Sequence, residues 1–428
     1  MDTTTESWMR RNLESSARRY RFDFIAVTEC DGLRLKDVAG RTYLDFTSGG
    51  QTSNLGHKPP EVIAAVQEQI ARTGLTSLGW ALNDTRIRLA EKLKEISPGA
   101  LSRGRVGYCN TGADATELSL RLARQFTGRS MVICSFGCFH GHTSLGSLSM
   151  NACPQGRSYD TMQIPGVMYV PFPYCYRCLF NQKVSSCGFE CLRFVEYQFE
   201  TKVIPPDRVA AFFIEPIQVH GGVVPLPDGY ARELARICRE NGILLVIDEV
   251  TTGFGRTGKM FGIQNWDVEV DILYMAKSVA AGLSLGAIVA GEEIMANFKG
   301  GGSFSGNPVA CAASLANIDV IEKKDLLSQA RRQGEHLSRR LAELSENHQI
   351  IGDVRGLGLL AGVELVEDAR TRKPATKATQ AIVQTAAREG LLMFPGGAYD
   401  NVLRLCPPLI ATTEDIDEAM SILDRVLP

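Results

Sequence analysis

The middle of the chain alternates short apolar runs with segments of helical period. Six apolar runs have the length of strands, at 104–110, 131–136, 210–216, 243–250, 271–277 and 285–291. Several of them are apolar throughout, which is typical of strands covered on both faces of a sheet. Amphipathic helical segments lie between them, at 116–128 and 229–242. This alternation predicts an α/β fold with a mostly parallel sheet and helices on both of its faces.

The pattern changes on both sides of this region. Long helical segments follow Asn307, and Pro308 is well placed for a first helical turn. After Ile350 come alternating strand patterns and a capped helix that begins near Thr412. These features predict a smaller α+β domain, which the strand-like start of the chain is expected to join. The predicted parts are an N-terminal segment, a large domain and a C-terminal small domain, at 1–60, 61–315 and 316–428.

Composition and charge argue against binding to nucleic acid or membranes. Hydrophobic residues make up 44% of the 428 residues and charged residues 22%, as in an ordinary globular protein. Lys and Arg number 46 against 48 Asp and Glu, so no basic excess favours binding to nucleic acid or a membrane surface. No apolar stretch approaches the about 18–20 residues of a membrane span. The first 22 residues resemble a short amphipathic helix rather than a secretory signal, so a cytoplasmic enzyme is expected.

The twelve cysteines are too scattered for a disulfide scaffold. Five of them have apolar neighbours and are expected to be reduced core thiols: Cys109, Cys134, Cys238, Cys311 and Cys406. Four others form a cluster in an insert near 173–192: Cys175, Cys178, Cys187 and Cys191. This spacing could bind a structural Zn²⁺, and free or occasionally oxidised thiols are the favoured alternative. No catalytic metal is expected.

Two residues at the ends of apolar strands are the main catalytic candidates. Asp248 comes at the end of one predicted strand, and Lys277 ends the next one, 29 residues later. Open α/β sheets place their ligands at this edge. An amine and a carboxylate there suit an aldehyde cofactor, with Lys277 forming a Schiff base and Asp248 holding a protonated ring nitrogen. A surface lysine and a loop-capping aspartate would give the same spacing.

Further motifs, in a fixed order, cover nearly the whole chain. They are YLDFTSGGQTSNLGHKPP, NTGADATELSLRLAR, FHGHT, EPIQVHGG, DEVTTGFGRTG, FSGNPVACAA and RLCPPL. Together they resemble those of the class III aminotransferases, which are fold-type-I enzymes dependent on pyridoxal 5′-phosphate (PLP). The resemblance implies amino and keto substrates and a homodimer whose active site is shared between subunits. It also identifies Lys277 and Asp248 as the catalytic pair.

The resemblance assigns the cofactor-binding positions. Thr111, Gly112 and Ala113 match the phosphate loop, where small residues precede a helix expected to start near Ala115. Phe139 matches the aromatic residue that stacks on the cofactor ring.

Three other positions complete the implied cofactor site. His140 follows Phe139 directly, and Glu215 matches the carboxylate of the Glu-Pro motif. Ser303 stands where the family usually has Thr, which contacts the phosphate of the other subunit's cofactor.

The departures from the family pattern concern substrate and ring contacts. Thr251 replaces a Gln that contacts the cofactor's phenolic oxygen. Arg404 matches the arginine that clamps a substrate carboxylate with two bonds. His220 replaces a Glu that pairs with this arginine in enzymes for ω-amines. We therefore expect Arg404 to stay available for a substrate α-carboxylate. Alternatively, the substrate carries an unusual group that His220 recognises, or His220 has only a packing role. Gln51 is expected to line the same site.

The opening motif and residues 351–375 resemble the dialkylglycine decarboxylase branch in particular. Gly50 replaces a Gln of that branch, and Asn307 replaces its alkali-metal-binding Asp, which argues against decarboxylation. The prediction is thus a PLP-dependent aminotransferase. The alternative is another fate of the same carbanion: racemisation, decarboxylation, elimination or replacement, or carbon–carbon bond formation. A non-catalytic scaffold is disfavoured because Lys277 and Asp248 are both present.

Overall fold

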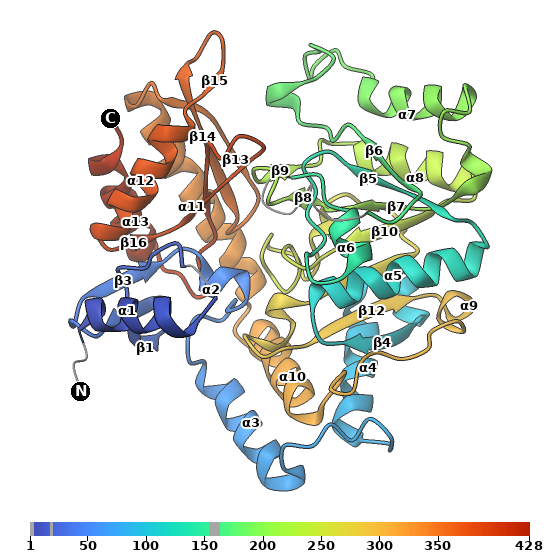
Figure 1. Cartoon of the computed structure of the whole chain (residues 1–428), viewed down its shortest axis with the longest axis horizontal. Coiled ribbons are helices and arrows are strands. Elements are labelled where there is room, and N and C mark those ends of the chain that lie inside the picture. The colour runs from blue at the N-terminus through green and yellow to red at the C-terminus, as the bar shows by residue number, and fades with distance from the viewer. Residues whose placement is uncertain (1–3, 18–19, 154–162) are drawn as a thin grey trace.

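The computed structural model describes residues 4–17, 20–153 and 163–428. Its largest sheet has seven strands in the order β4-β12-β11-β10-β7-β5-β6 (Figure 1). The strands are β4 (Arg105–Cys109), β5 (Met131–Ser135), β6 (Val167–Val170), β7 (Val209–Ile214), β10 (Leu244–Asp248), β11 (Ile272–Met275) and β12 (Gly286–Ala290). Strand β12 is antiparallel to both of its neighbours, and the other pairs are parallel. The prediction of a mostly parallel sheet is confirmed.

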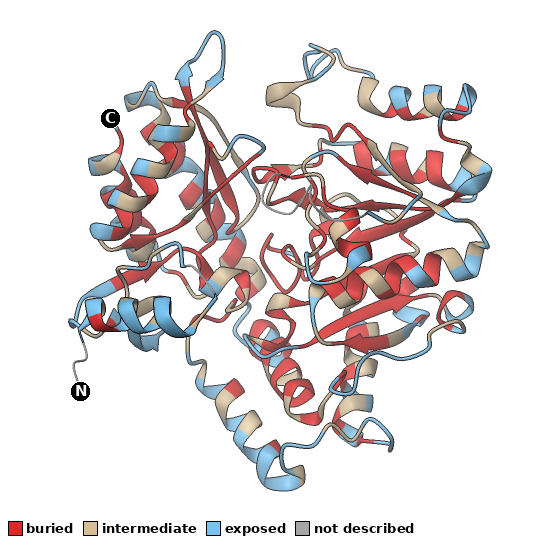
Figure 2. Cartoon of the chain, in the orientation of Figure 1, coloured by how far each residue is buried: buried red, intermediate tan, exposed pale blue. Residues whose placement is uncertain are grey.

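Both faces of this sheet are buried, which explains why its strands lack alternation. In β10, Leu245 and Ile247 join one hydrophobic core, and Leu244 and Val246 join another on the opposite face. Helix α8 (Tyr230–Glu240) contributes to the first core and α5 (Gly112–Thr127) to the second. Figure 2 shows the buried strands between helices whose outer faces are exposed. Full burial of each such aliphatic side chain stabilises the fold by about 1.5–3 kcal/mol.

Two helices, α10 (Pro308–Lys323) and α13 (Thr413–Val426), begin where the sequence predicts. Asn307 caps α10, and Thr412 caps α13 with a capping box. Helix α5 begins at Gly112, earlier than the predicted start near Ala115, because Thr111 forms a capping box of its own. The other helices of this part are α3 (Pro60–Thr73), α4 (Asp84–Ile96), α6 (Leu145–Ser149), α7 (Glu190–Glu200) and α9 (Glu292–Met295). A short hairpin joins β8 (Ile217–Gln218) to β9 (Val224–Pro225).

The two ends of the chain build a second lobe (Figure 1). Its strands are β1 (Val27–Asp31), β2 (Arg34–Asp37), β3 (Thr42–Asp45), β13 (Ile351–Gly356), β14 (Ala361–Asp368), β15 (Lys373–Pro374), β16 (Leu391–Leu392), β17 (Phe394–Gly396) and β18 (Val402–Leu405). Its helices are α1 (Thr5–Ser15), α2 (Ser48–Gln51), α11 (Leu326–Asn347), α12 (Thr376–Arg388) and α13. Strand β3 pairs in parallel with β16, so the start of the chain lies in the same sheet as a segment near its end.

Helix α1 covers only part of the predicted amphipathic N-terminal segment, of which residues 1–3 and 18–19 lie outside the described residues. Within the described ranges, no helix is long and apolar enough to cross a membrane.

Candidate active site

Asp248 is the last residue of β10 and is only 4% exposed. Its Oδ2 accepts a hydrogen bond from the Tyr274 hydroxyl at 2.6 Å and lies 2.8 Å from Nδ1 of His140. Its Oδ1 accepts from the Val250 backbone N–H at 2.9 Å. Burial opposes a charged imidazole, but Cys138 and the Asp248 carboxylate together raise the pKa of His140 well above its ordinary value. The carboxylate is therefore held on both of its oxygens.

Lys277 lies two residues beyond β11, not within the strand as the sequence predicted. The strand ends at Met275, and Lys277 has a left-handed backbone with φ of 41°. Its Nζ donates to Oε1 of Gln51 at 2.9 Å and to Oγ1 of Thr251 at 2.7 Å. Burial lowers the pKa of Lys277 to about 8, although the charge of Asp248 opposes this shift. An amine with this pKa is neutral often enough to act as a nucleophile near neutral pH.

Three predicted residues form another wall of the same site. The Phe139 backbone N–H donates to Oε1 of Glu215 at 3.1 Å, and the Phe139 ring stacks on His220 with 4.1 Å between centroids. Burial and the charge of Asp248 raise the pKa of Glu215 to about 7. Burial and the charge of Arg404 lower the pKa of His220 well below its ordinary value, so His220 is neutral.

Arg404 lies on β18 and is 9% exposed. Its Nε donates to the Pro395 carbonyl at 3.1 Å, and its guanidinium carbon lies 5.9 Å from the centroid of the Phe394 ring. Among the described residues, its buried Nη1 has no hydrogen-bond partner. Burial lowers the pKa of Arg404 to about 10. A buried guanidinium nitrogen without an acceptor suits an incoming carboxylate.

The N-terminus of α5 adjoins the loop that follows Asp248. Thr111 accepts from the Asp114 backbone N–H at 3.1 Å, which satisfies one donor of the first turn. The N–H groups of Gly112 and Ala113 belong to that turn, where no intrahelical acceptor exists. A Cβ at Gly112 would lie 3.1 Å from Val250, so the small residue allows a close approach here. Such a helix start binds phosphate readily.

Among the predicted site residues, Ser303 alone does not lie with the others in the single chain. It is exposed, as is Phe304 beside it. The loop that carries Ser303 passes near the predicted phosphate loop, because a Cβ at Gly302 would lie 3.2 Å from Nδ2 of Asn110.

The profile of the class III aminotransferase family matches residues 15–427. The chain belongs to the class III aminotransferases. It is 36% identical over 415 residues to a leucine/methionine racemase from Thermococcus litoralis, covering 96% of this chain and 92% of that protein. It is 34% identical over 431 residues to a 5-aminovalerate aminotransferase from Pseudomonas putida, covering 99% of each.

The structural comparison agrees with this membership. An amine transaminase from an uncultivated Pseudomonas species, solved in its PLP-bound form, matches with a TM-score of 0.89 and 31% identity. The match covers 96% of this chain and 97% of that one. The predicted fold-type-I architecture, the dependence on PLP and the aminotransferase reaction are thereby confirmed.

The residues of this class III aminotransferase fit PLP on their own chemistry. An amine with a pKa of about 8 suits an aldehyde, and the buried carboxylate of Asp248 suits a positively charged ring nitrogen. The first turn of α5 suits a phosphate.

Sequence reasoning missed the residues that hold the Gln51 loop. Asp45 is fully buried and accepts from the backbone N–H groups of Thr47 and Gly49, each at 2.8 Å. Nε2 of His57 lies 2.8 Å from its Oδ2. These bonds fix the turn that brings Gln51 to Lys277. The position of Asp45 at the end of a strand-like segment is a signal that could have identified it.

Arg256 was missed as well, although a charged residue in the motif GFGRTG is conspicuous. Its side chain is 1% exposed and donates to the carbonyls of Leu359, at 3.2 Å, and Pro407. It also lies 3.4 Å from Oγ of Ser48. Arg256 thus joins three distant segments beside the site.

The cysteine-rich insert follows β6 and ends in the first turn of α7, which contains Cys191. Its four predicted thiols line one cavity with Phe180 and Phe189, and all four are free and half-buried. Burial and the neighbouring thiol of Cys187 raise the pKa of Cys191 to about 12. No group of three or more metal-ligating side chains is arranged around a common point in the ranges that the structure describes. The zinc site therefore stays a hypothesis.

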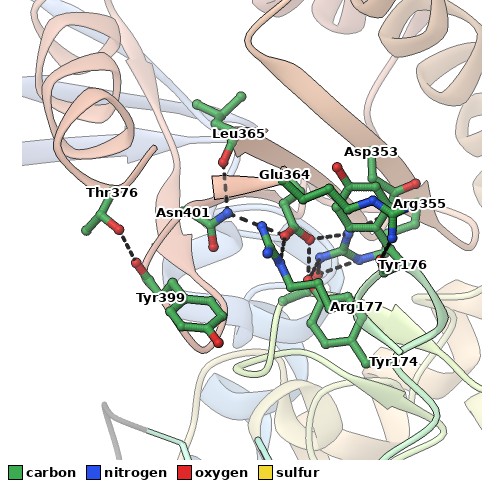
Figure 3. A network of polar contacts seen from close by, with 12 residues as sticks. Tyr174, Tyr176, Arg177, Asp353, Arg355, Glu364, Leu365, Thr376, Tyr399 and Asn401 are labelled. Carbon is green, nitrogen blue, oxygen red and sulfur yellow. Dashed lines mark hydrogen bonds and ion pairs between the residues drawn. The ribbon is translucent and has the colours of Figure 1, made fainter. Parts of the chain in front are cut away.

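Polar side chains dock the insert on the second lobe (Figure 3). Tyr174 and Arg177 donate to the buried carboxylate of Glu364 on β14. Arg355 donates to the same carboxylate and, through Nη2, to the Gly222 carbonyl, both at 2.7 Å. Because Gly222 lies in the turn that carries His220, the network connects the insert to one wall of the active site.

Proposed function

We propose that this aminotransferase acts on amino acids whose α-carboxylate binds Arg404. The observation that carries the proposal is the state of Arg404, which is buried and forms no ion pair with a carboxylate in the described part of the chain. His220 stands beside it as a neutral imidazole and provides no negative charge to mask it. The guanidinium fork matches a carboxylate with two parallel bonds.

The other residues take roles that follow from their positions. Lys277 attaches the cofactor and then moves the proton at the substrate Cα, a task suited to an amine with a pKa of about 8. Asp248 holds the ring nitrogen positively charged, Phe139 covers the ring, and the start of α5 at Gly112 binds the phosphate. When bound, PLP supplies an electron sink for the negative charge on that carbon.

We extend the proposal to a homodimer in the cytoplasm. Large apolar side chains on the segment 75–82 are exposed, with Trp80 at 85% and Leu82 at 92%. This segment adjoins the Ser303 loop, because a Cβ at Gly79 would lie 3.8 Å from the Ser303 carbonyl. Exposed apolar groups gathered beside a predicted cofactor contact favour a subunit interface.

The test is a panel of α-amino acids, ω-amino acids and simple amines, each offered with several 2-oxo acids. Products are identified by mass spectrometry. We expect keto products from α-amino acids, and weak or absent turnover of amines that lack a carboxylate. Efficient turnover of simple amines alone would contradict the assignment of Arg404.

Racemisation is a second candidate, because several relatives carry names of that kind. Besides the leucine/methionine racemase, the chain is 35% identical to an alanine/serine racemase from Pyrococcus horikoshii and 33% identical to an isoleucine 2-epimerase from Lentilactobacillus buchneri. Racemisation needs the Cα proton to be removed from one face and a proton to be returned to the opposite face, and Lys277 can perform the removal. Chiral chromatography of L-amino acids incubated without any keto acid separates the two reactions, since only racemisation then gives D-product.

A further inference from the structure

A tyrosine hydroxyl lies in the interior of the large sheet. Tyr274 is 0% exposed, in a strand whose other residues are all buried and apolar. A hydroxyl buried there without a partner would destabilise the fold. Strands β10 and β11 are parallel, and their register places Tyr274 directly opposite Asp248. The hydroxyl donates to Oδ2 of Asp248 at 2.6 Å.

The hydrogen bonds of Asp248 can be counted. A carboxylate offers two in-plane acceptor positions on each oxygen. Those of Oδ2 face the Tyr274 hydroxyl at 2.6 Å and Nδ1 of His140 at 2.8 Å. One position of Oδ1 is taken by the Val250 N–H. Among the described residues, the one position left without a donor is on Oδ1.

We infer that Tyr274 is a positioning residue. Together with His140 it occupies both acceptor positions of Oδ2 of Asp248, so that Oδ1 is the oxygen presented to the cofactor's ring nitrogen. This rests on the proposed role of Asp248. Two donors on one oxygen also stabilise the charge of a carboxylate buried away from water. The alternative is that the Tyr274 ring only packs, for example against Phe213, whose ring centroid is 6.4 Å away.

The test compares Tyr274→Phe with Tyr230→Phe in the holoenzyme. Tyr230 is also 0% exposed, but its hydroxyl has no hydrogen-bond partner among the described residues, so it is a matched control. The readouts are the PLP dissociation constant, the pH titration of the visible absorption of bound PLP, kcat and KM. Thermal unfolding of each variant checks that it is folded.

We expect Tyr274→Phe to weaken PLP binding by about 10- to 150-fold, the factor for losing one hydrogen bond to a charged group. The absorption titration should shift and kcat should fall, while KM stays within about twofold. Tyr230→Phe should match the wild type. Equal behaviour of the two variants would overturn the inference, even if Tyr274→Phe lowers the unfolding temperature. Unchanged PLP affinity and an unchanged absorption titration in Asp248→Asn would instead refute the proposed role of Asp248.

A second measurement needs no variant. The chain has six histidines, so ¹⁵N-histidine labelling gives few signals. With Oδ2 as acceptor from both sides, Nδ1 of His140 must carry a proton from pH 6 to 9. A deprotonated Nδ1 would mean that His140 accepts from Tyr274 instead, at their separation of 3.0 Å, and would overturn the inference even if Tyr274→Phe does not fold.

Discussion

The active-site edge of the large sheet and the cysteine-rich insert both concentrate titratable groups, but they hold them differently. At the sheet edge, Asp248 is bound by a backbone N–H and by a residue of the adjacent strand. In the insert, docking depends on the side chains of Tyr174 and Arg177, which converge on Glu364. The proposed catalytic residues thus lie near strand ends, whereas the insert is held by side-chain hydrogen bonds that single substitutions can remove. Changes at the two places should therefore have separable effects.

The largest effect is expected at Lys277. Lys277→Ala removes the amine that we propose attaches PLP, so turnover should fall to background while the unfolding temperature changes little. Lys259→Ala, at an exposed lysine in the loop after β10, is the control and should keep full activity. Activity near the wild-type level in Lys277→Ala would show that another amine takes this role.

Arg404→Lys should have the next largest effect. A point charge replaces a two-bond fork, and the loss of one bond to a charged group corresponds to about 10- to 150-fold in kcat/KM. The loss should appear with α-amino acids and be absent with amines that have no carboxylate. Equal losses on both substrate classes would mean that Arg404 supports the fold rather than the substrate.

A smaller effect should appear in the pH dependence of cofactor loading. Only the neutral amine attacks an aldehyde, and the pKa of Lys277 is about 8. Below pH 8 the neutral fraction falls about tenfold per pH unit. The rate of PLP uptake by the apoenzyme, followed by stopped-flow absorbance, should fall likewise between pH 8 and 6. Pyridoxine 5′-phosphate, which lacks the aldehyde, is the control ligand. A PLP uptake rate independent of pH in this range would contradict the lowered pKa.

The smallest effect on activity is expected at Glu364. Glu364→Gln removes the buried charge that pairs with the half-buried Arg177 and Arg355. Removing one partner of a fully buried ion pair costs about 3–5 kcal/mol, and the loss here should be smaller because Arg355 keeps its ion pair with Asp353. The insert should loosen, so thiol reagents should label its four cysteines faster, while kcat changes little. Glu367→Gln, at an exposed position of the same strand, should leave the labelling rate unchanged. A large fall in kcat in Glu364→Gln alone would show that the insert controls the His220 wall.

Much of this fold could be predicted because buried strands are continuous apolar runs. Six of the seven strands of the large sheet have that signal. Strand β6 was not predicted, since it is a four-residue edge strand and three of its residues are only half-buried. The left-handed backbone conformation at Lys277 also has no signal in the local sequence, because it depends on neighbours far along the chain.

The site divides in the same way. The candidates Asp248 and Lys277 follow from their places near strand ends, and the other predicted cofactor positions follow from motif order. Tyr274 could not be separated from ordinary core aromatics, because its proposed role depends on a partner in the adjacent strand. The contact between Gln51 and Lys277 joins residues from two lobes, which no local pattern encodes.

The pairing of β3 with β16 has a consequence for biosynthesis. Leu44 emerges early from the ribosome but pairs with Leu391, and Ser48 donates to the carbonyl of Cys406. The loop that carries Gln51 therefore cannot reach its position beside Lys277 until almost the whole chain has been synthesised. Closing so long a loop is slow. Cofactor loading is thus an event that follows the completion of translation, and a nascent chain arrested before residue 391 should emerge without a finished active site.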